Sequence, residues 1–345
     1  MHVLVTGHLG YLGVIVSRVL GDAGHDVVGL DSGYYDGCSL GPEPKPLPMY
    51  RCDIRDVQPM HLKGIDAVIH LAALSNDPVG DLAPEITYEI NHHASVRLAL
   101  LARDAGVRRF LYSSTCSVYG AAGGDDLVDE DAPLRPVTPY AISKVRVEDE
   151  LHALADSDFV PVSLRNATAY GFSPQLRADI VVNNLVGWAY LTGEVKVLSD
   201  GTPWRPLVHA EDIASAFLAL LEADAPAVNG QAFNVGRQGE NHRVRDIAAA
   251  VAATVPGCRV TVAGEAGNDP RSYRVDFSRL TRAVPAYRAR WTMREGAEEI
   301  YAAYQKYGLS ADDFHNKFVR LRRLAALQAT GRVDQDLRFT SAELS

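Results

Sequence analysis

Two patterns in the sequence predict a doubly wound α/β fold, with a parallel sheet and a smaller C-terminal α/β lobe. In the first half of the chain, short runs rich in Val, Ile and Leu alternate with helical patterns. Continuously apolar strands separated by helices are typical of a parallel sheet that is covered on both faces. The first strand also leads into glycines at every third position before an apolar helix begins, namely Gly7, Gly10 and Gly13.

The predicted elements follow one another in a regular order. We predict strands over residues 3–6, 27–31, 67–72, 109–114 and 160–165, and helices over 11–23, 89–105 and 140–155. The second half has shorter elements, predicted as helices over 179–191, 212–221, 243–255 and 295–307 and strands over 195–198, 232–235 and 260–262. A capping box of Thr292 and Glu295 marks the start of the last of these helices.

These elements divide the chain into three parts. Residues 1–166 are predicted to form the sheet domain, and further sheet elements return within residues 205–255. Residues 167–307 form the smaller lobe, which is interleaved with the sheet, and residues 308–345 form a C-terminal helical extension. Because apolar side chains recur in the extension at helical spacing, we expect it to pack on the lobe, with a subunit contact as the alternative; they are Phe314, Phe318, Leu321, Leu324 and Leu327.

The composition is that of an ordinary soluble globular protein, since 47% of the 345 residues are hydrophobic and 22% are charged. A formal net charge of -9, with no basic stretch to offset it, argues against a nucleic-acid partner. The four cysteines form no CxxC pair and no cluster with histidine, so we expect reduced thiols and no metal site. Without a secretory segment or an apolar run near about 18 residues, we expect a cytoplasmic protein with no membrane partner.

The glycine loop predicts a binding site for a dinucleotide. A strand, then Gly7-x-x-Gly10-x-x-Gly13, then a helix is the layout that places a diphosphate at a helix N-terminus. The second predicted strand ends in Asp31, 18 residues beyond Gly13, where a carboxylate accepts hydrogen bonds from the adenosine ribose. An acid at this place repels a 2′-phosphate, so we predict NAD rather than NADP. A structural turn is the alternative interpretation of the glycines.

The segment Thr138-Pro-Tyr140-Ala-Ile-Ser-Lys144 carries the candidate chemistry. Thr138 can cap a helix and proline suits its first position, which places Tyr140 and Lys144 one turn apart on one face. A phenol with a pKa of about 10 is a poor base at neutral pH. A nearby ammonium group and the positive nicotinamide ring would stabilise the phenolate, so Tyr140 can act as a base. A surface tyrosine and lysine are the alternative.

The motifs together resemble the extended branch of the short-chain dehydrogenase/reductase superfamily, which has the Rossmann fold. His8 stands where G-x-G-x-x-G has its second glycine, and G-x-x-G-x-x-G is the spacing of that superfamily. The segments around Asp53, His70 and Asn91 are also similar to family segments that surround the cofactor. The resemblance implies that NAD is bound by Gly7, Gly10, Tyr11, Leu12, Gly13, Asp31, Asp53, Ile54, Leu71, Ala72, Ala73, Asn91, Ser113, Tyr140 and Lys144.

The same resemblance implies a catalytic set and a substrate class. The family places a third catalytic group in the segment that ends in Val118-Tyr-Gly120, so Thr115 joins Tyr140 and Lys144 as the hydroxyl that binds the reacting sugar oxygen. Family members of this type act on nucleoside-diphosphate sugars, and two arginines can bind the diphosphate. Arg165 is expected near the nicotinamide and His209 in a structural role. The implied substrate contacts are Ser75, Thr115, Cys116, Ser117, Asn166, Asn183, Asn184, Arg205 and Arg271.

The residues after Thr115 favour one reaction over the others. The 4,6-dehydratases of this type place Glu, or Asp-Glu, directly after the threonine, whereas this chain has Cys116 and Ser117. We therefore predict an NAD-dependent 4-epimerase that works through a transient 4-keto intermediate. The alternatives are a 4,6-dehydratase, a decarboxylase, a dehydrogenase or reductase, and a silent NAD sensor. Family members commonly dimerise through the helices predicted here over 89–105 and 140–155, so we expect a homodimer.

Overall fold

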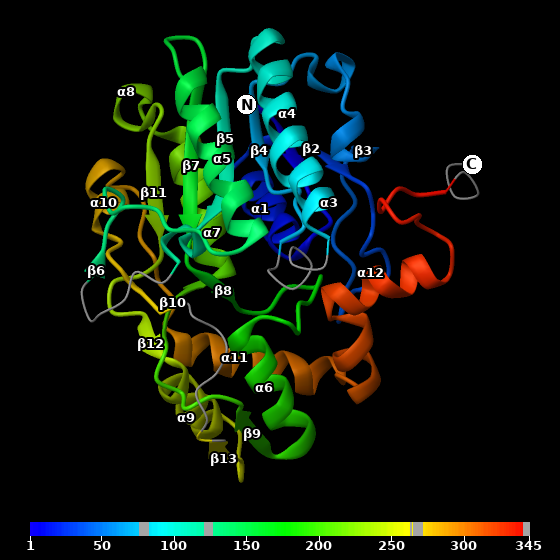
Figure 1. The fold of residues 1–345 in the computed structure, drawn as a ribbon, viewed down its shortest axis with the longest axis vertical. Coiled ribbons are helices and arrows are strands. Elements are labelled where there is room, and N and C mark those ends of the chain that lie inside the picture. The colour runs from blue at the N-terminus through cyan, green and yellow to red at the C-terminus, as the bar shows by residue number, and fades with distance from the viewer. Residues whose placement is uncertain (76–82, 121–126, 263, 265–271, 341–345) are drawn as a thin grey trace.

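The computed structural model describes residues 1–75, 83–120, 127–262, 264 and 272–340 of the chain. Its centre is a seven-stranded sheet of order β11-β7-β5-β4-β1-β2-β3, in which each neighbouring pair is parallel (Figure 1). The strands are β1 (His2–Thr6), β2 (Asp26–Asp31), β3 (Met49–Arg51), β4 (Ala67–His70), β5 (Arg109–Thr115), β7 (Val160–Asn166) and β11 (Ala232–Val235).

Helices cover both faces of this sheet because its strands are apolar on both sides. Val3 and Val5 of β1 pack in one core with α1 (Tyr11–Asp22) and α7 (Ala210–Glu222). Leu4, between them, points to the other core, together with α4 (Ala94–Asp104) and α5 (Pro139–Leu154). A short helix α3 (Pro84–Tyr88) and a π-helical turn (Glu89–His93) lead into α4. The predicted doubly wound α/β fold is therefore confirmed.

The smaller lobe has its own core. It is built from α6 (Val181–Thr192), α9 (Val244–Thr254) and α11 (Met293–Tyr307), with β9 (Glu194–Val197) paired to β13 (Arg259–Val262). Thr292 and Glu295 form the predicted capping box of α11. A three-stranded sheet joins the lobe to the main sheet and consists of β8 (Thr168–Tyr170), β10 (Trp204–His209) and β12 (Asn241–Arg243). Further elements are β6 (Leu127–Val128), β14 (Arg274–Val275), α8 (Ala225–Val228), α10 (Ser278–Ala283) and the 3₁₀ turns Ile54–Asp56, Pro59–Leu62 and Cys116–Tyr119.

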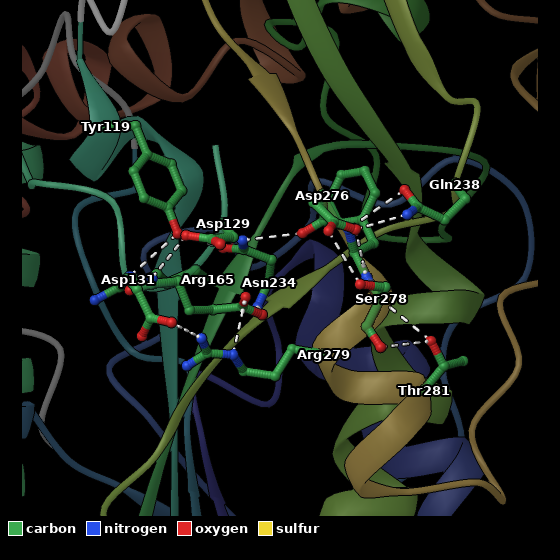
Figure 2. Close-up of polar contacts among 12 residues, drawn as sticks. Tyr119, Asp129, Asp131, Arg165, Asn234, Gln238, Asp276, Ser278, Arg279 and Thr281 are labelled. Atoms are coloured by element: carbon green, nitrogen blue, oxygen red, sulfur yellow. Dashed lines mark hydrogen bonds and ion pairs between the residues drawn. The ribbon is translucent and has the colours of Figure 1, made fainter. Parts of the chain in front are cut away.

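A buried polar network, seen in Figure 2, fastens β7 and β11 to the segments around them. Arg165 of β7 donates from Nη1 to the Tyr119 hydroxyl at 3.1 Å, and that hydroxyl donates to Asn234 of β11 at 2.7 Å. On its other side, Arg165 pairs with Glu148 of α5 at 2.7 Å. Because the guanidinium finds all these acceptors locally, its charge is neutralised inside the protein.

The C-terminal extension bridges the lobe and the main sheet. After α11 it forms a π-helical turn (Asp313–Lys317) and α12 (Arg320–Ala329), which lies between the lobe and the β2–β3 side in Figure 1. Phe314 and Phe318 pack in the lobe core, as expected, but Leu324 and Leu327 pack in the core beneath β2 and α4. The expectation that the whole extension packs on the lobe is therefore wrong for α12. No helix in the described part of the chain has both the length and the apolar character to cross a membrane.

Candidate active site

A cavity of about 580 Å³ opens at the carboxyl ends of the central strands, between the main sheet and the lobe. Neighbours of β1 in the sheet are β2 on one side and β4 on the other, so the chain order reverses at this point. Ligands of open α/β sheets bind in the crevice at such a switch point. The volume lies within the range of small-molecule and cofactor sites.

The glycine loop forms the floor of the cavity. Gly7 adopts φ +72°, and a Cβ there would lie 2.8 Å from the Ala72 nitrogen. A Cβ on Gly13 would lie 2.1 Å from the Gly7 oxygen, so both positions require glycine. Helix α1 begins at Tyr11 after Gly10, and the first N–H groups of a helix have no partners within it. This bare turn can therefore hold the diphosphate of a dinucleotide.

His8 explains how the loop departs from G-x-G-x-x-G. Its side chain is buried and does not line the cavity. The imidazole ring instead packs against Gly29 of β2, where a Cβ would come within 2.4 Å of it. A histidine is therefore accommodated at the second-glycine position because the neighbouring strand has no side chain there.

Asp31 occupies the predicted place at the end of β2. Its carboxylate accepts hydrogen bonds from the Leu9 N–H at 3.0 Å and the Gly33 N–H at 2.8 Å. Burial raises the pKa of Asp31 above its ordinary value. Both carboxylate oxygens retain acceptor capacity beyond these two bonds, which suits the adenosine ribose. Asp53 also lines the cavity and is held in an ion pair with Arg55 at 2.7 Å.

Tyr140 and Lys144 come together at the opposite end of the cavity. Thr138 caps α5 by accepting a hydrogen bond from the Ala141 N–H at 3.2 Å, which places both residues on the helix turn that lines the cavity. Lys144 is 3% exposed, and its Nζ lies 5.6 Å from the centroid of the Tyr140 ring. That nitrogen donates to the Ser113 carbonyl at 2.7 Å. Burial lowers the pKa of Lys144 to about 7, although the Glu148 carboxylate opposes this shift.

The end of β5 and the 3₁₀ turn that follows it (Cys116–Tyr119) contribute side chains to the cavity wall. Thr115 and Ser117 line it, and the Thr115 hydroxyl accepts from the Ser117 N–H at 3.1 Å. Cys116 points away, is 1% exposed and lies with its Sγ 3.1 Å from the Arg165 carbonyl. Burial raises the pKa of the Cys116 thiol well above its ordinary value. Cys116 begins the 3₁₀ turn Cys116–Tyr119, which directs its side chain into the core, so it does not line the cavity where the expected contact with substrate would be made.

Three further predicted residues are buried behind the cavity wall. Asn91 bonds the backbone of Leu74 through both its amide groups, at 2.8 and 3.0 Å. Asn183 bonds the Gly171 backbone in the same way, at 3.1 Å for each bond. Arg165 belongs to the buried network described above. The polar groups of these side chains are hydrogen-bonded to neighbouring protein groups. None of the three residues lines the cavity, contrary to expectation.

The other predicted residues are found as follows. The structure places on the cavity wall all of the remaining predicted contacts that it describes: Gly7, Gly10, Tyr11, Leu12, Gly13, Asp31, Asp53, Ile54, Leu71, Ala72, Ala73, Ser75, Ser113, Thr115, Ser117, Tyr140, Lys144, Asn166, Asn184 and Arg205. Arg271 lies outside the described residues. His209 is fully buried and hydrogen-bonded to Glu299 at 2.9 Å, in the structural role expected.

Several residues that line the cavity were not predicted. Tyr34 and Tyr35 follow β2, Arg177 precedes α6, and Arg320 begins α12. Arg177 pairs with Asp179 at 2.9 Å and donates to the Ser75 hydroxyl at 3.2 Å. The tyrosine pair after Asp31 was a usable signal, because that loop borders any dinucleotide bound at the end of β2. Nothing in the local sequence indicated the two arginines.

Comparisons with known proteins agree with this geometry. The family model described as NAD dependent epimerase/dehydratase family matches residues 3–236. The UDP-glucose 4-epimerase of Mycolicibacterium smegmatis is 33% identical over 270 residues, which are 74% of this chain and 83% of that protein. The structure of MoeE5 in complex with UDP-glucuronic acid and NAD superposes with a TM-score of 0.76 at 29% identity, covering 89% of this chain and 99% of the other.

One solved relative carries out a different reaction. TunA, an NAD dependent NDP-hexosamine 5,6-dehydratase involved in tunicamycin biosynthesis, superposes with a TM-score of 0.78 at 26% identity. The superposition covers 88% of this chain and 98% of that chain. Overall likeness therefore points to NAD and to this group of enzymes without separating epimerases from dehydratases. The cradle at Gly7 and Gly13, the helix start at Tyr11 and the carboxylate of Asp31 fit NAD.

Proposed function

This chain belongs to the NAD-dependent epimerase/dehydratase family, and within that family we propose that it is a nucleoside-diphosphate-sugar 4-epimerase. Its cofactor is NAD. The relatives reported above include an enzyme named for UDP-glucose and a protein solved with UDP-glucuronic acid, which supports a nucleotide sugar as substrate.

The residues divide the proposed reaction between them. Tyr140 takes the proton from the C4 hydroxyl of the sugar, and the ammonium group of Lys144, one helix turn away, stabilises the phenolate. Thr115 holds the same sugar oxygen through its hydroxyl group. NAD, when bound, supplies the acceptor for the C4 hydride and the donor that returns it. The 4-keto sugar turns over in the cavity and presents its opposite face for reduction at C4, and Tyr140 then returns the proton to the C4 oxygen.

The observation that carries the choice of an epimerase is the makeup of the cavity wall after Thr115. Elimination of water needs an additional acid and base beside the sugar. In this chain Cys116 is buried with a raised pKa, and Ser117 offers only a hydroxyl group. Among the described residues, the carboxylates that line the cavity are Asp31, Asp53 and Asp179.

None of these three carboxylates suits the role of a second base. Asp31 bonds the glycine loop, while Asp53 and Asp179 are held in ion pairs with Arg55 and Arg177. An arginine partner lowers the basicity of a carboxylate. The described wall therefore supports oxidation and reduction at one carbon, and it offers little for elimination.

The test is product analysis with the purified protein. We expect it to convert UDP-, dTDP-, GDP- or CDP-linked hexoses or hexuronic acids into their C4 epimers, followed by NMR of the sugar, with no net NADH. A 4-keto-6-deoxy product would show a dehydratase instead, release of CO2 a decarboxylase, and stoichiometric NADH a dehydrogenase. A protein that binds NAD but converts none of these sugars would contradict an enzymatic role for these substrates.

We further propose that the enzyme works as a cytoplasmic homodimer. Helices α4 and α5 pack side by side on one face of the sheet, and Leu100 of α4 is 43% exposed there. An exposed apolar side chain on a helix pair supports a contact with the same pair of a second copy. Light scattering at micromolar concentration, which separates a monomer of 37.4 kDa from a dimer, measures this directly.

A further inference from the structure

The first residue of α12 places an unusual charge in the cavity wall. Arg320 is 3% exposed and lines the cavity, and its Nη1 has no hydrogen-bond partner among the described residues. The guanidinium carbon lies 3.8 Å from the centroid of the Tyr35 ring, which holds one face of the group. Burial of a charged donor without an acceptor is costly, so a ligand that supplies an acceptor to Nη1 would gain affinity here.

Hydrogen bonds connect this residue to the start of α1. Phe318, two residues before Arg320, accepts from the Ala178 N–H at 2.9 Å. The same segment reaches α1 through Ser173, whose hydroxyl donates to the Tyr11 carbonyl at 2.9 Å. Residues 173–178 thus join the start of α12 to the helix N-terminus at the glycine loop. The Arg320 guanidinium and the N-terminus of α1 both favour an anion, and they border one cavity.

The charged side chains of Arg177, Asp179 and Arg320 together carry a net positive charge. Arg177 neighbours Arg320, and Asp179, a described carboxylate that acts on Arg320, is paired with Arg177 at 2.9 Å. Burial lowers the pKa of Arg320, and the nearby Arg177 guanidinium acts in the same direction. Two guanidiniums therefore share one acid where the cavity passes the glycine loop.

We propose that Arg320 binds the diphosphate of NAD, which makes the C-terminal extension a part of the cofactor site. A guanidinium donates two parallel hydrogen bonds to phosphate oxygens, and the N–H groups at the start of α1 serve the same diphosphate. The contacts of the extension with the loop after β2 indicate that this diphosphate belongs to NAD. Arg323 of α12 donates to the carbonyls of Tyr34 and Asp36 at 3.1 and 3.0 Å, in the loop that follows Asp31, where the adenosine ribose would bind.

The extension holds Arg320 in place through contacts that are independent of the ligand. Besides the bonds of Arg323, Leu324 and Leu327 are buried in the core beneath β2 and α4. The Tyr34 ring stacks on Phe339 at 5.5 Å. The inference concerns NAD binding and does not depend on the proposed sugar chemistry, so either can fail alone.

The test compares R320M with R322M. Arg322 lies on the same helix but is exposed, so its variant removes an equal charge outside the cavity. We expect R320M to purify with less NAD per protomer and, after NAD is removed, to bind NAD and ADP-ribose about 10- to 100-fold more weakly by calorimetry. R322M should match the parent protein. Adenosine, which has no phosphate, should bind all three proteins with equal affinity by NMR.

Three outcomes would overturn the proposal. The first is that R320M, folded by circular dichroism, binds ADP-ribose within about twofold of the parent protein. The second is that adenosine and ADP-ribose lose affinity by the same factor, since Arg320 would then only shape the cleft. The third is that UDP binding to the NAD-loaded protein falls while NAD binding does not, which would assign the guanidinium to the substrate.

If R320M fails to fold, R320K decides the question. An ammonium group keeps the charge but cannot form the two parallel hydrogen bonds. ADP-ribose should then bind about 3- to 10-fold more weakly, with adenosine unchanged. Equal affinities of R320K and the parent protein for ADP-ribose would contradict a guanidinium contact with the diphosphate.

Discussion

Two buried arginines have opposite surroundings in this protein. Arg165, 6% exposed, lies in the network between β7 and β11, where Glu148, Tyr119 and the Glu130 carbonyl satisfy its guanidinium. Arg320, 3% exposed, faces the cavity with its Nη1 unpaired among the described residues. The acceptors of Arg165 belong to the protein, so its charge serves the fold, whereas Arg320 has a donor left over on the wall of a cavity that can hold a ligand. Substitutions in the two regions should therefore separate stability from function.

The largest effect should come from Tyr140→Phe in the cavity. Loss of the phenol removes the proposed acid and base, so turnover should fall by about 10³-fold. The protein should still purify with NAD and keep its denaturation midpoint, because Tyr140 lines the cavity and the phenyl ring is retained. Steady-state assays, released NAD and urea titrations measure the three quantities, with Tyr50→Phe on the exposed edge strand as control. Retention of a tenth of the activity would contradict the role of Tyr140.

Glu148→Ala should act in the opposite way, on stability. It leaves the Arg165 guanidinium buried without its carboxylate, which should lower the free energy of unfolding by about 3–5 kcal/mol. Glu150→Ala, an exposed position on the same helix, should change it by less than about 0.5 kcal/mol. If urea denaturation gave the same stability for both variants, the network would not be the structural unit that we describe.

Lys144→Met should give a smaller, pH-dependent effect, since Lys144 lines the cavity and also feels the charge of Glu148. The pKa of Lys144 is about 7 in the folded protein and near 10.5 when unfolded. At a pH between these two pKa values, Lys144 holds its proton only in the unfolded chain. The cost of burying the charge is therefore complete below pH 7 and decreases as the pH rises. The stability of K144M relative to the parent protein should therefore fall by about 2–3 kcal/mol from pH 7 to pH 9.

NAD-depleted protein and urea titrations at both pH values measure this difference. Lys63→Met, at an exposed position, provides the control and should show no such trend. A difference between K144M and the parent protein that does not vary with pH would mean that Lys144 is not held in the buried state described here.

The sequence predicted the parts of the site that depend on local spacing. Gly7, Gly13 and Asp31 lie on the wall because a strand, a tight turn and a helix leave one arrangement for them. Tyr140 and Lys144 share a face because a helix repeats every 3.6 residues. Strand alternation could not predict the position of Cys116, because β5 ends at Thr115 and Cys116 begins a 3₁₀ turn that directs its side chain into the core.

Other features could not be predicted from local patterns. Asn91 and Asn183 have side chains suited to ligand binding, but they bond the backbone of Leu74 and Gly171, a choice that only packing decides. Arg320 lies far along the chain from the glycine loop that shares its cavity. No periodicity of the extension indicated that its apolar stripe would be divided between two cores, with Phe314 in one and Leu324 in the other.

The contacts of the C-terminal extension can form only late in the synthesis of the chain. Arg323 bonds Tyr34 and Asp36 across 289 and 287 residues, and Arg338 bonds Asp56 across 282. The β2–β3 edge therefore leaves the ribosome long before the residues that lock it in place, and contacts so distant in sequence form late. A nascent chain that stops before residue 320 would already contain the glycine loop and Tyr140. It would still lack Arg320 and the rest of the extension that contribute to NAD binding. We therefore expect NAD to bind only after synthesis is complete.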